Sequence, residues 1–171
     1  MIKQTIHIGL RLVCFVLLQV WVLNSIHLFR VAELFLYIDV ILKFPTQMSR
    51  SQMVVTSFLL GYAIDVFSNT PGMHAAACAL IGFLRTPLVH VYVDREMTES
   101  VIPSFRAFGT GAFIRYGITL ILIHHAALFL IESVSFFDPL FVLFRIFASA
   151  VFTALSVFVV ETFNVSRKSG H

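Results

Sequence analysis

The stretch FLLGYAIDVFSNTPGMHAAACALIGFLRTP, residues Phe58 to Pro87, decides how this chain folds. It is apolar on both sides of a single carboxylate, Asp65, and of a Pro-Gly pair at positions 71 and 72. Pro71 presets the bend at the second position of a turn, and Gly72 can adopt the positive φ that the third position requires. The stretch therefore predicts two apolar helices joined by a tight turn, with Asp65 about one helical turn before the first helix ends.

The composition of the whole chain predicts a polytopic, all-α membrane protein. Of its 171 residues 58% are hydrophobic and only 12% are charged, and its mean hydropathy is +0.92. A soluble domain of this size needs more charge on its surface. The two cysteines, Cys14 and Cys78, lie in apolar runs, which favours buried thiols over a disulfide framework or a metal site. No cofactor is expected, and the basic residues are scattered singly, which argues against a nucleic-acid partner.

A helix needs about 20 mainly apolar residues to cross the hydrocarbon core of a membrane. Windows of that kind predict a bundle of six transmembrane helices in a single integral membrane domain that covers residues 1–171. The predicted spans are approximately residues 6–28, 30–44, 52–67, 73–93, 107–131 and 139–161. The second window is the weakest, because it is short and contains Glu33 and Asp39 before Pro45 stops it, so a tilted or partly re-entrant segment is an alternative.

The distribution of Lys and Arg predicts that both termini are cytoplasmic. Along a six-span path the basic residues outside the spans fall on one side of the membrane, and only Arg30 falls on the other. The residues expected on the cytoplasmic side are Lys3, Lys43, Arg50, Arg95, Arg106, Arg167 and Lys168. The first window leads into VLNSIHLF without a small-residue cleavage site, so we expect a retained span rather than a signal peptide.

Ionisable residues inside the predicted spans need a partner, a route to the interface or a function. We expect ion pairs and hydrogen bonds between helices that fix the bundle, with Arg11 and Arg85 extending toward the interface. A substrate or proton path and a partner-docking role are the alternatives. Judged by depth along the spans, Asp39 lies level with three arginines that could pair with it, Arg11, Arg85 and Arg115.

Two further sets of polar residues lie toward the outer ends of the spans. Asp65 and Arg145 have opposite charge and matched depth, and we expect them to pair. The neighbours His124 and His125 point about 100° apart on a helix, so they cannot both bind one metal ion without local unwinding. Their place near the outer end of the fifth span favours an interfacial role.

Small residues after the turn predict close helix packing. MHAAACALIG places Ala75, Ala79 and Gly82 with Cys78 along adjoining faces of one helix, and Gly61 offers a matching gap in the preceding helix. Small residues let two helices in a membrane approach closely. We therefore expect this helical hairpin to be the tightly packed centre of the protein.

Motifs of catalysis are missing from the sequence. It contains no HExxH, no GxSxG, no Gly-rich phosphate loop and no cysteine cluster. An enzyme is therefore not expected. A small membrane enzyme of lipid metabolism is kept as a third hypothesis, beside the scaffold and the transporter component described below.

The stretch from Phe58 to Arg85 resembles the family of the rod shape-determining protein MreD. That family's pattern is Phe-x-x-Gly-x-x-x-Asp, an apolar residue or two, a short Ser/Asn turn, Gly-x-His-Ala, and an Ala-rich span that closes near an arginine. The matching positions are Phe58, Gly61, Asp65, Phe67, Ser68, Asn69, Gly72, His74, Ala75 and Arg85. Gln19 and Asn24 also resemble the family's first span, whereas VAELF departs from it, with Glu33 near a position where relatives usually have Pro.

The resemblance implies a non-enzymatic, multi-pass scaffold in the bacterial inner (cytoplasmic) membrane. Its direct partner would be the bitopic protein MreC, through which it would couple MreB filaments to the RodA glycosyltransferase and a penicillin-binding transpeptidase, regulating lateral peptidoglycan synthesis and cell shape. The family is also similar in fold to the six-helix substrate-binding components of energy-coupling-factor vitamin transporters, and that function is the alternative. We expect Asp65 and the Pro71-Gly72 turn either to hold a rigid corner against which a partner packs, or to serve only their own bundle.

Overall fold

The computed structural model describes residues 17, 19, 27–28, 32–94, 101–133 and 138–169. Within them lie four long helices, α3 (Arg50–Ser68), α4 (Met73–Tyr92), α6 (Thr110–Glu132) and α7 (Pro139–Ser169), and a short helix, α5 (Phe105–Phe108). Each long helix is long and apolar enough to cross a membrane, α7 over its first 25 residues. The expectation of a mainly helical bundle with helices able to cross a membrane is confirmed at this level, and these helices correspond to the last four predicted spans.

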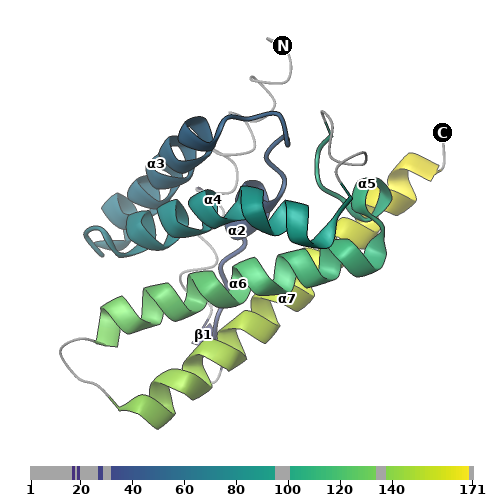
Figure 1. Ribbon diagram of the computed structural model, residues 1–171. Helices are drawn as coiled ribbons and strands as arrows, with labels where there is room; N and C mark the ends of the chain where they lie inside the picture. The colour runs from purple at the N-terminus through teal and green to yellow at the C-terminus, as the bar shows by residue number, and fades with distance from the viewer. Residues whose placement is uncertain are drawn as a thin grey trace.

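The four long helices form two hairpins. α3 and α4 lie antiparallel, and α6 and α7 form the second pair, with α4 packed on α6 (Figure 1). The turn between α3 and α4 lies on the left of Figure 1 together with the facing ends of α6 and α7, whereas α5 and the C-terminal end of α7 lie on the right. Consecutive long helices therefore run in alternating directions, as a path that crosses a membrane repeatedly requires.

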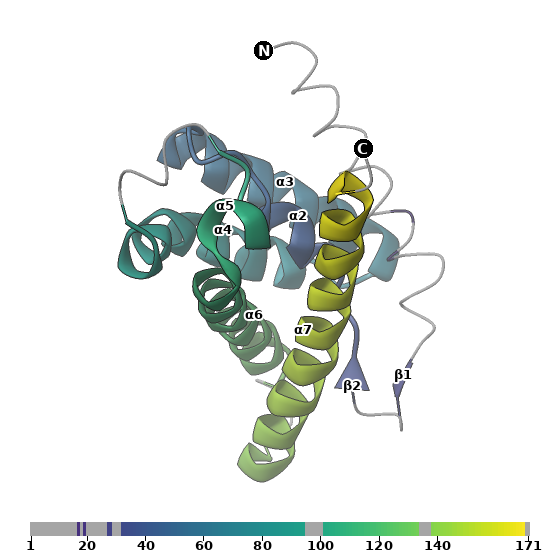
Figure 2. The same ribbon diagram turned by 90° about the vertical axis from the view of Figure 1, so that its right-hand side faces the viewer.

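The segment predicted as the second span is not one continuous helix. Residues 32–33 form strand β2 (Ala32–Glu33), which pairs antiparallel with β1 (His27–Leu28), and residues 38–42 form the five-residue helix α2 (Ile38–Leu42). The expected helix over 30–44 is therefore wrong for the described part of that window. All five residues of α2 are buried, and Figure 2 shows α2 behind α7, in the interior of the bundle. The first predicted span lies almost wholly outside the described residues, so six spans stay a prediction.

The backbone between β2 and α2 takes its hydrogen bonds from side chains of α7. The Glu33 N–H donates to Ser149 Oγ at 3.0 Å, and the Phe35 N–H donates to Thr153 Oγ1 at 3.2 Å. Both hydroxyl residues are fully buried. Because irregular backbone is tolerated at membrane depth only where the protein itself supplies partners, these two hydroxyls explain how the segment can lie there without being helical.

The opposite edge of the same segment is bound by Gln19. Its Nε2 donates to the Leu34 carbonyl at 2.8 Å, and its Oε1 accepts from the Leu36 N–H at 3.1 Å. Gln19 is only 1% exposed. The side chain thus pairs as a neighbouring strand would, with one donor and one acceptor. This is the structural role of Gln19, which the family resemblance had pointed to in the first span. Asn24 lies outside the described residues.

Candidate functional site

Asp65 caps the helix that follows it across the turn. Its Oδ1 accepts from the His74 N–H at 2.9 Å and from Thr70 Oγ1 at 3.0 Å, and its Oδ2 accepts from the Ala75 N–H at 2.9 Å. The N-cap position of α4 is Gly72, which has no side chain to offer, so α3 supplies the cap instead. A carboxylate here satisfies amides that have no partner within the helix and faces the positive end of its dipole.

The turn between α3 and α4 has the predicted chemistry. The Met73 N–H donates to the Thr70 carbonyl at 3.3 Å, and Gly72 has φ 83° and ψ −9°. With Pro71 at the second position these angles define a type II turn, as expected. Asn69, which the family pattern places in the turn, ends α3 in a left-handed conformation with φ 55° that was not predicted. Asparagine tolerates that conformation better than most residues, so the signal was present.

Glycines bring α3 and α4 into backbone contact. A Cβ at Gly61 would lie 2.4 Å from the His74 carbonyl oxygen, and one at Gly82 would lie 2.5 Å from Ser57 Oγ. The predicted close approach is therefore confirmed, and it lets the Asp65 carboxylate reach the first turn of α4. Phe58, from the same motif, is 45% exposed and stacks on Tyr62 with ring centroids 6.3 Å apart.

His74 begins a buried chain of polar side chains that joins three elements. Its Nδ1 lies 2.8 Å from Tyr37 Oη, which lies 3.0 Å from His124 Nε2 on α6. No described residue is a hydrogen-bond partner for His124 Nδ1. The tautomer that leaves no buried N–H unpaired therefore has His124 donating to Tyr37, and Tyr37 donating to His74.

The two adjacent histidines of α6 are both fully buried, so the interfacial role expected for them is wrong. His125 Nδ1 donates to the Ile121 carbonyl at 2.8 Å, and its Nε2 lies 3.2 Å from Thr153 Oγ1 on α7. His124 instead faces α4, as their angular separation on the helix demands. Among the described residues no group of three His, Cys, Asp or Glu side chains is placed to hold a metal ion.

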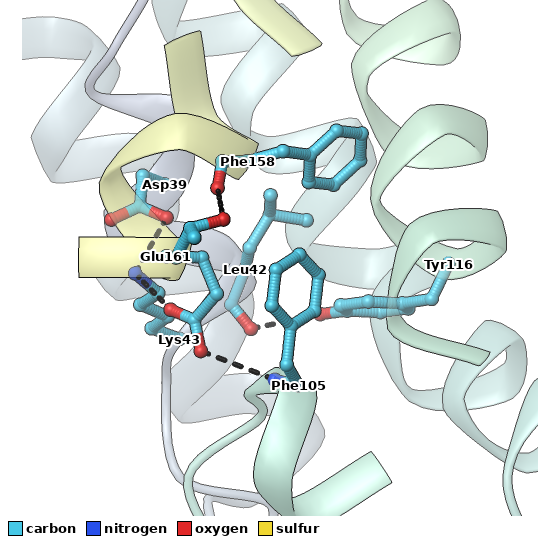
Figure 3. Close-up of polar contacts among 8 residues, drawn as sticks. Asp39, Leu42, Lys43, Phe105, Tyr116, Phe158 and Glu161 are labelled. Carbon is cyan, nitrogen blue, oxygen red and sulfur yellow. Dashed lines mark hydrogen bonds and ion pairs between the residues drawn. The ribbon is translucent and has the colours of Figure 1, made fainter. Parts of the chain in front are cut away.

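A second buried polar cluster, the Lys43 cluster, lies at the opposite end of α2 (Figure 3). Lys43 Nζ contacts Asp39 Oδ1 at 3.0 Å and Glu161 Oε2 at 2.9 Å. Glu161 also accepts from the Phe105 N–H of α5 at 3.1 Å through its Oε1. Tyr116 donates to the Leu42 carbonyl at 3.0 Å. Asp39 thus has an ion pair with Lys43, a partner the sequence reasoning did not consider, and Glu161 was missed because it ends the last predicted span.

Arg85 is buried and does not extend toward the interface. It is 1% exposed and donates from Nη2 to the Phe44 carbonyl, just beyond the C-terminal end of α2. Together with Tyr116 it supplies donors where helix α2 leaves carbonyls without partners, and its charge suits the negative end of the helix dipole. The expected snorkelling of Arg85 is therefore wrong, and Arg11 lies outside the described residues.

Arg145 pairs with two glutamates rather than with Asp65. Its Nη2 lies 2.5 Å from Glu33 Oε1, its Nη1 lies 2.9 Å from Glu132 Oε2, and its guanidinium stands 4.4 Å from the centroid of the Phe129 ring. The predicted pairing with Asp65 is wrong, because α4 amides already occupy that carboxylate. Glu33, the residue that departs from the family pattern, thus ties β2 to α7.

No protein-family model, curated protein or solved structure matches this chain. The polar members of the motif, Asp65, His74 and Arg85, are engaged inside the bundle, whereas its aromatic member Phe58 is exposed. This arrangement builds a rigid helical hairpin with an apolar outer face.

Proposed function

We propose that this chain is a non-enzymatic scaffold of the bacterial rod-shape complex in the cytoplasmic membrane, similar to the MreD family, and that it binds MreC directly. Through MreC it would act on MreB filaments, RodA and a penicillin-binding transpeptidase. The observation that carries the proposal is the α3–α4 hairpin, in which Asp65 fixes α3 against α4, while His74 and Arg85 bind the residues that flank α2.

The outer face of α3 is the surface we propose for the partner. Six large apolar residues on this helix are exposed, and α3 lies at the edge of the bundle (Figure 1). They are Val55, Phe58, Leu59, Tyr62, Val66 and Phe67. Because lipid and a partner helix are equally apolar, such a face gains affinity through close packing against a rigid surface. Asp65 keeps the face rigid by fixing α3 to α4, so it supports docking without touching the partner.

The test is site-specific photo-crosslinking in living cells of the native organism. A photoreactive residue at Phe58 or Tyr62, both exposed on α3, is expected to capture MreC. The same residue at Phe147, which is 58% exposed on α7, is the matched control because it has similar size and exposure on another helix. Capture of MreC from α3 and not from α7 supports the proposal, whereas capture of ATPase subunits would favour the vitamin-transporter alternative.

A second measurement tests whether the corner at Asp65 supports docking. Asp65→Asn is expected to lower recovery of MreC with the tagged protein after mild detergent extraction, because a loosened hairpin no longer presents one surface. An Asp65→Asn protein that is inserted, as stable as wild type and still bound to MreC would count against the part assigned to this corner.

A further inference from the structure

Arg115 is a charged residue on the outer surface of a helix that is apolar enough to cross a membrane. It is the sixth residue of α6, about 8 Å along the axis from the first at a rise of 1.5 Å per residue. Its side chain is exposed, and the described residues offer it no ion pair. A charge in that place is costly unless a counter-charge reaches it.

The other arginines of the described bundle do not share this situation. Arg85 is buried against a carbonyl, and Arg145 has two carboxylates. Arg50 stands over the Phe83 ring at 5.5 Å, but it is the first residue of α3, where water is close. Arg106 is exposed on the short helix α5, before the apolar helix α6 begins. Among the arginines whose side chains are described, Arg115 is therefore the one that lies within an apolar, membrane-length helix and has its counter-charge outside the described bundle.

Arg115 lies beside an aromatic ring that is itself held in place by a hydrogen bond. It lies 5.9 Å from the centroid of the Tyr92 ring, on the neighbouring helix α4. Tyr92 Oη is 3.0 Å from Thr119 Oγ1, and that hydroxyl donates to the Arg115 carbonyl at 2.9 Å. Tyr92 is therefore the donor to Thr119, and this bond fixes the ring. A guanidinium above an aromatic ring still has its in-plane N–H groups available for a bidentate oxyanion.

The neighbouring surface indicates what kind of molecule carries the oxyanion. Val91 on α4 is 71% exposed, and Ile118 on α6 is 39% exposed. A phosphate with acyl chains attached would satisfy both the charge and this apolar surround, and basic sites between membrane helices are known to suit anionic lipid headgroups. We propose that Arg115 and Tyr92 form a binding site for the phosphate of an anionic phospholipid, in the leaflet where α6 begins. The proposal does not depend on the function proposed above.

Native mass spectrometry of the purified protein, titrated with phosphatidylglycerol in detergent, tests the site. Arg115→Gln is expected to lower the association constant of the first bound lipid about tenfold, the loss typical of one charge-assisted contact. Arg106→Gln is the matched control, since Arg106 is exposed on α5 and also contributes one positive charge. It is expected to change the constant less than twofold.

Two further variants separate an oriented site from general charge. Arg115→Lys keeps the charge but loses the planar fork, and Tyr92→Phe keeps the ring but loses its bond to Thr119, so each is expected to weaken binding between twofold and fivefold. Equal losses for Arg115→Gln and Arg106→Gln would overturn the proposal. The proposal would also be overturned if Arg115→Gln lowered the association constants of phosphatidylcholine and phosphatidylglycerol equally. It would likewise be overturned if the Arg115→Gln protein bound phosphatidylglycerol as wild type does, because the counter-charge of Arg115 would then come from another part of the chain.

Discussion

Replacing Asp65 by Asn tests the capping geometry directly. The carboxylate uses both oxygens, Oδ1 for the His74 N–H and Thr70, and Oδ2 for the Ala75 N–H. An amide offers one oxygen, so a buried backbone N–H is left facing an NH₂ group, which costs about 1–3 kcal/mol. Loss of the negative charge at the N-terminus of α4 adds about 0.3–2 kcal/mol. The expected loss in free energy of unfolding is therefore roughly 1–5 kcal/mol.

Asp138 provides a matched control for this substitution. It caps α7 with a single oxygen, since Oδ1 accepts from both the Leu140 N–H at 3.1 Å and the Phe141 N–H at 3.2 Å, and it is exposed. Asn can keep both bonds there, so Asp138→Asn is expected to cost less than about 0.5 kcal/mol. Both variants are measured by SDS-driven unfolding in mixed micelles. If Asp65→Asn costs no more than Asp138→Asn, the two-oxygen cap is not what holds the hairpin.

Three other substitutions test the packing and the two buried polar clusters by the same unfolding measurement. Gly61→Ala is expected to cost more than about 2 kcal/mol because its Cβ would meet backbone, whereas Gly111→Ala, with open space around it, is expected to be neutral or slightly stabilising. Tyr37→Phe removes the hydroxyl shared by two histidines and is expected to cost about 1–3 kcal/mol, and wild-type stability would show that those histidines find other partners. Lys43→Met removes the cation that lies 3.0 Å from Asp39 and 2.9 Å from Glu161 and is expected to cost about 3–5 kcal/mol, so a smaller loss than for Tyr37→Phe would contradict the pairing.

Features of this fold that depend on neighbouring residues in the sequence were predictable. The turn at Pro71 and Gly72 needs only those two residues, and the close approach at Gly61 and Gly82 follows from small side chains at helical spacing. Both are local statements about which backbone conformations and separations a residue permits. The left-handed conformation of Asn69 belongs to the same class, because it depends on the residue type, although only the place of Asn69 in the turn was predicted.

Partners of the buried charges were not predictable in the same way. Depth along the spans placed Asp65 level with Arg145. Matching charged side chains by depth leaves backbone amides out of account, and the first turn of α4 offers two amides to the Asp65 carboxylate. Arg145 instead forms an ion pair with Glu33, which lies in a segment that the hydropathy pattern predicted to be helical. That segment could be non-helical because Ser149 and Thr153, more than a hundred positions later in the sequence, supply its hydrogen bonds.

The segment from β2 to α2 explains why this bundle contains so many polar groups. Apolar contacts hardly distinguish a neighbouring helix from lipid, so they cannot alone fix how the α3–α4 hairpin sits against the α6–α7 hairpin. The segment joins both, since Tyr37 contacts His74 and His124, and Lys43 contacts Glu161 of α7. Each of these contacts has one geometry in which its donors and acceptors are matched, and a shifted helix would leave a polar atom unpaired in an apolar interior. The buried polar clusters thus set the relative position of the hairpins, which leaves their lipid-facing surfaces free to be shaped by binding.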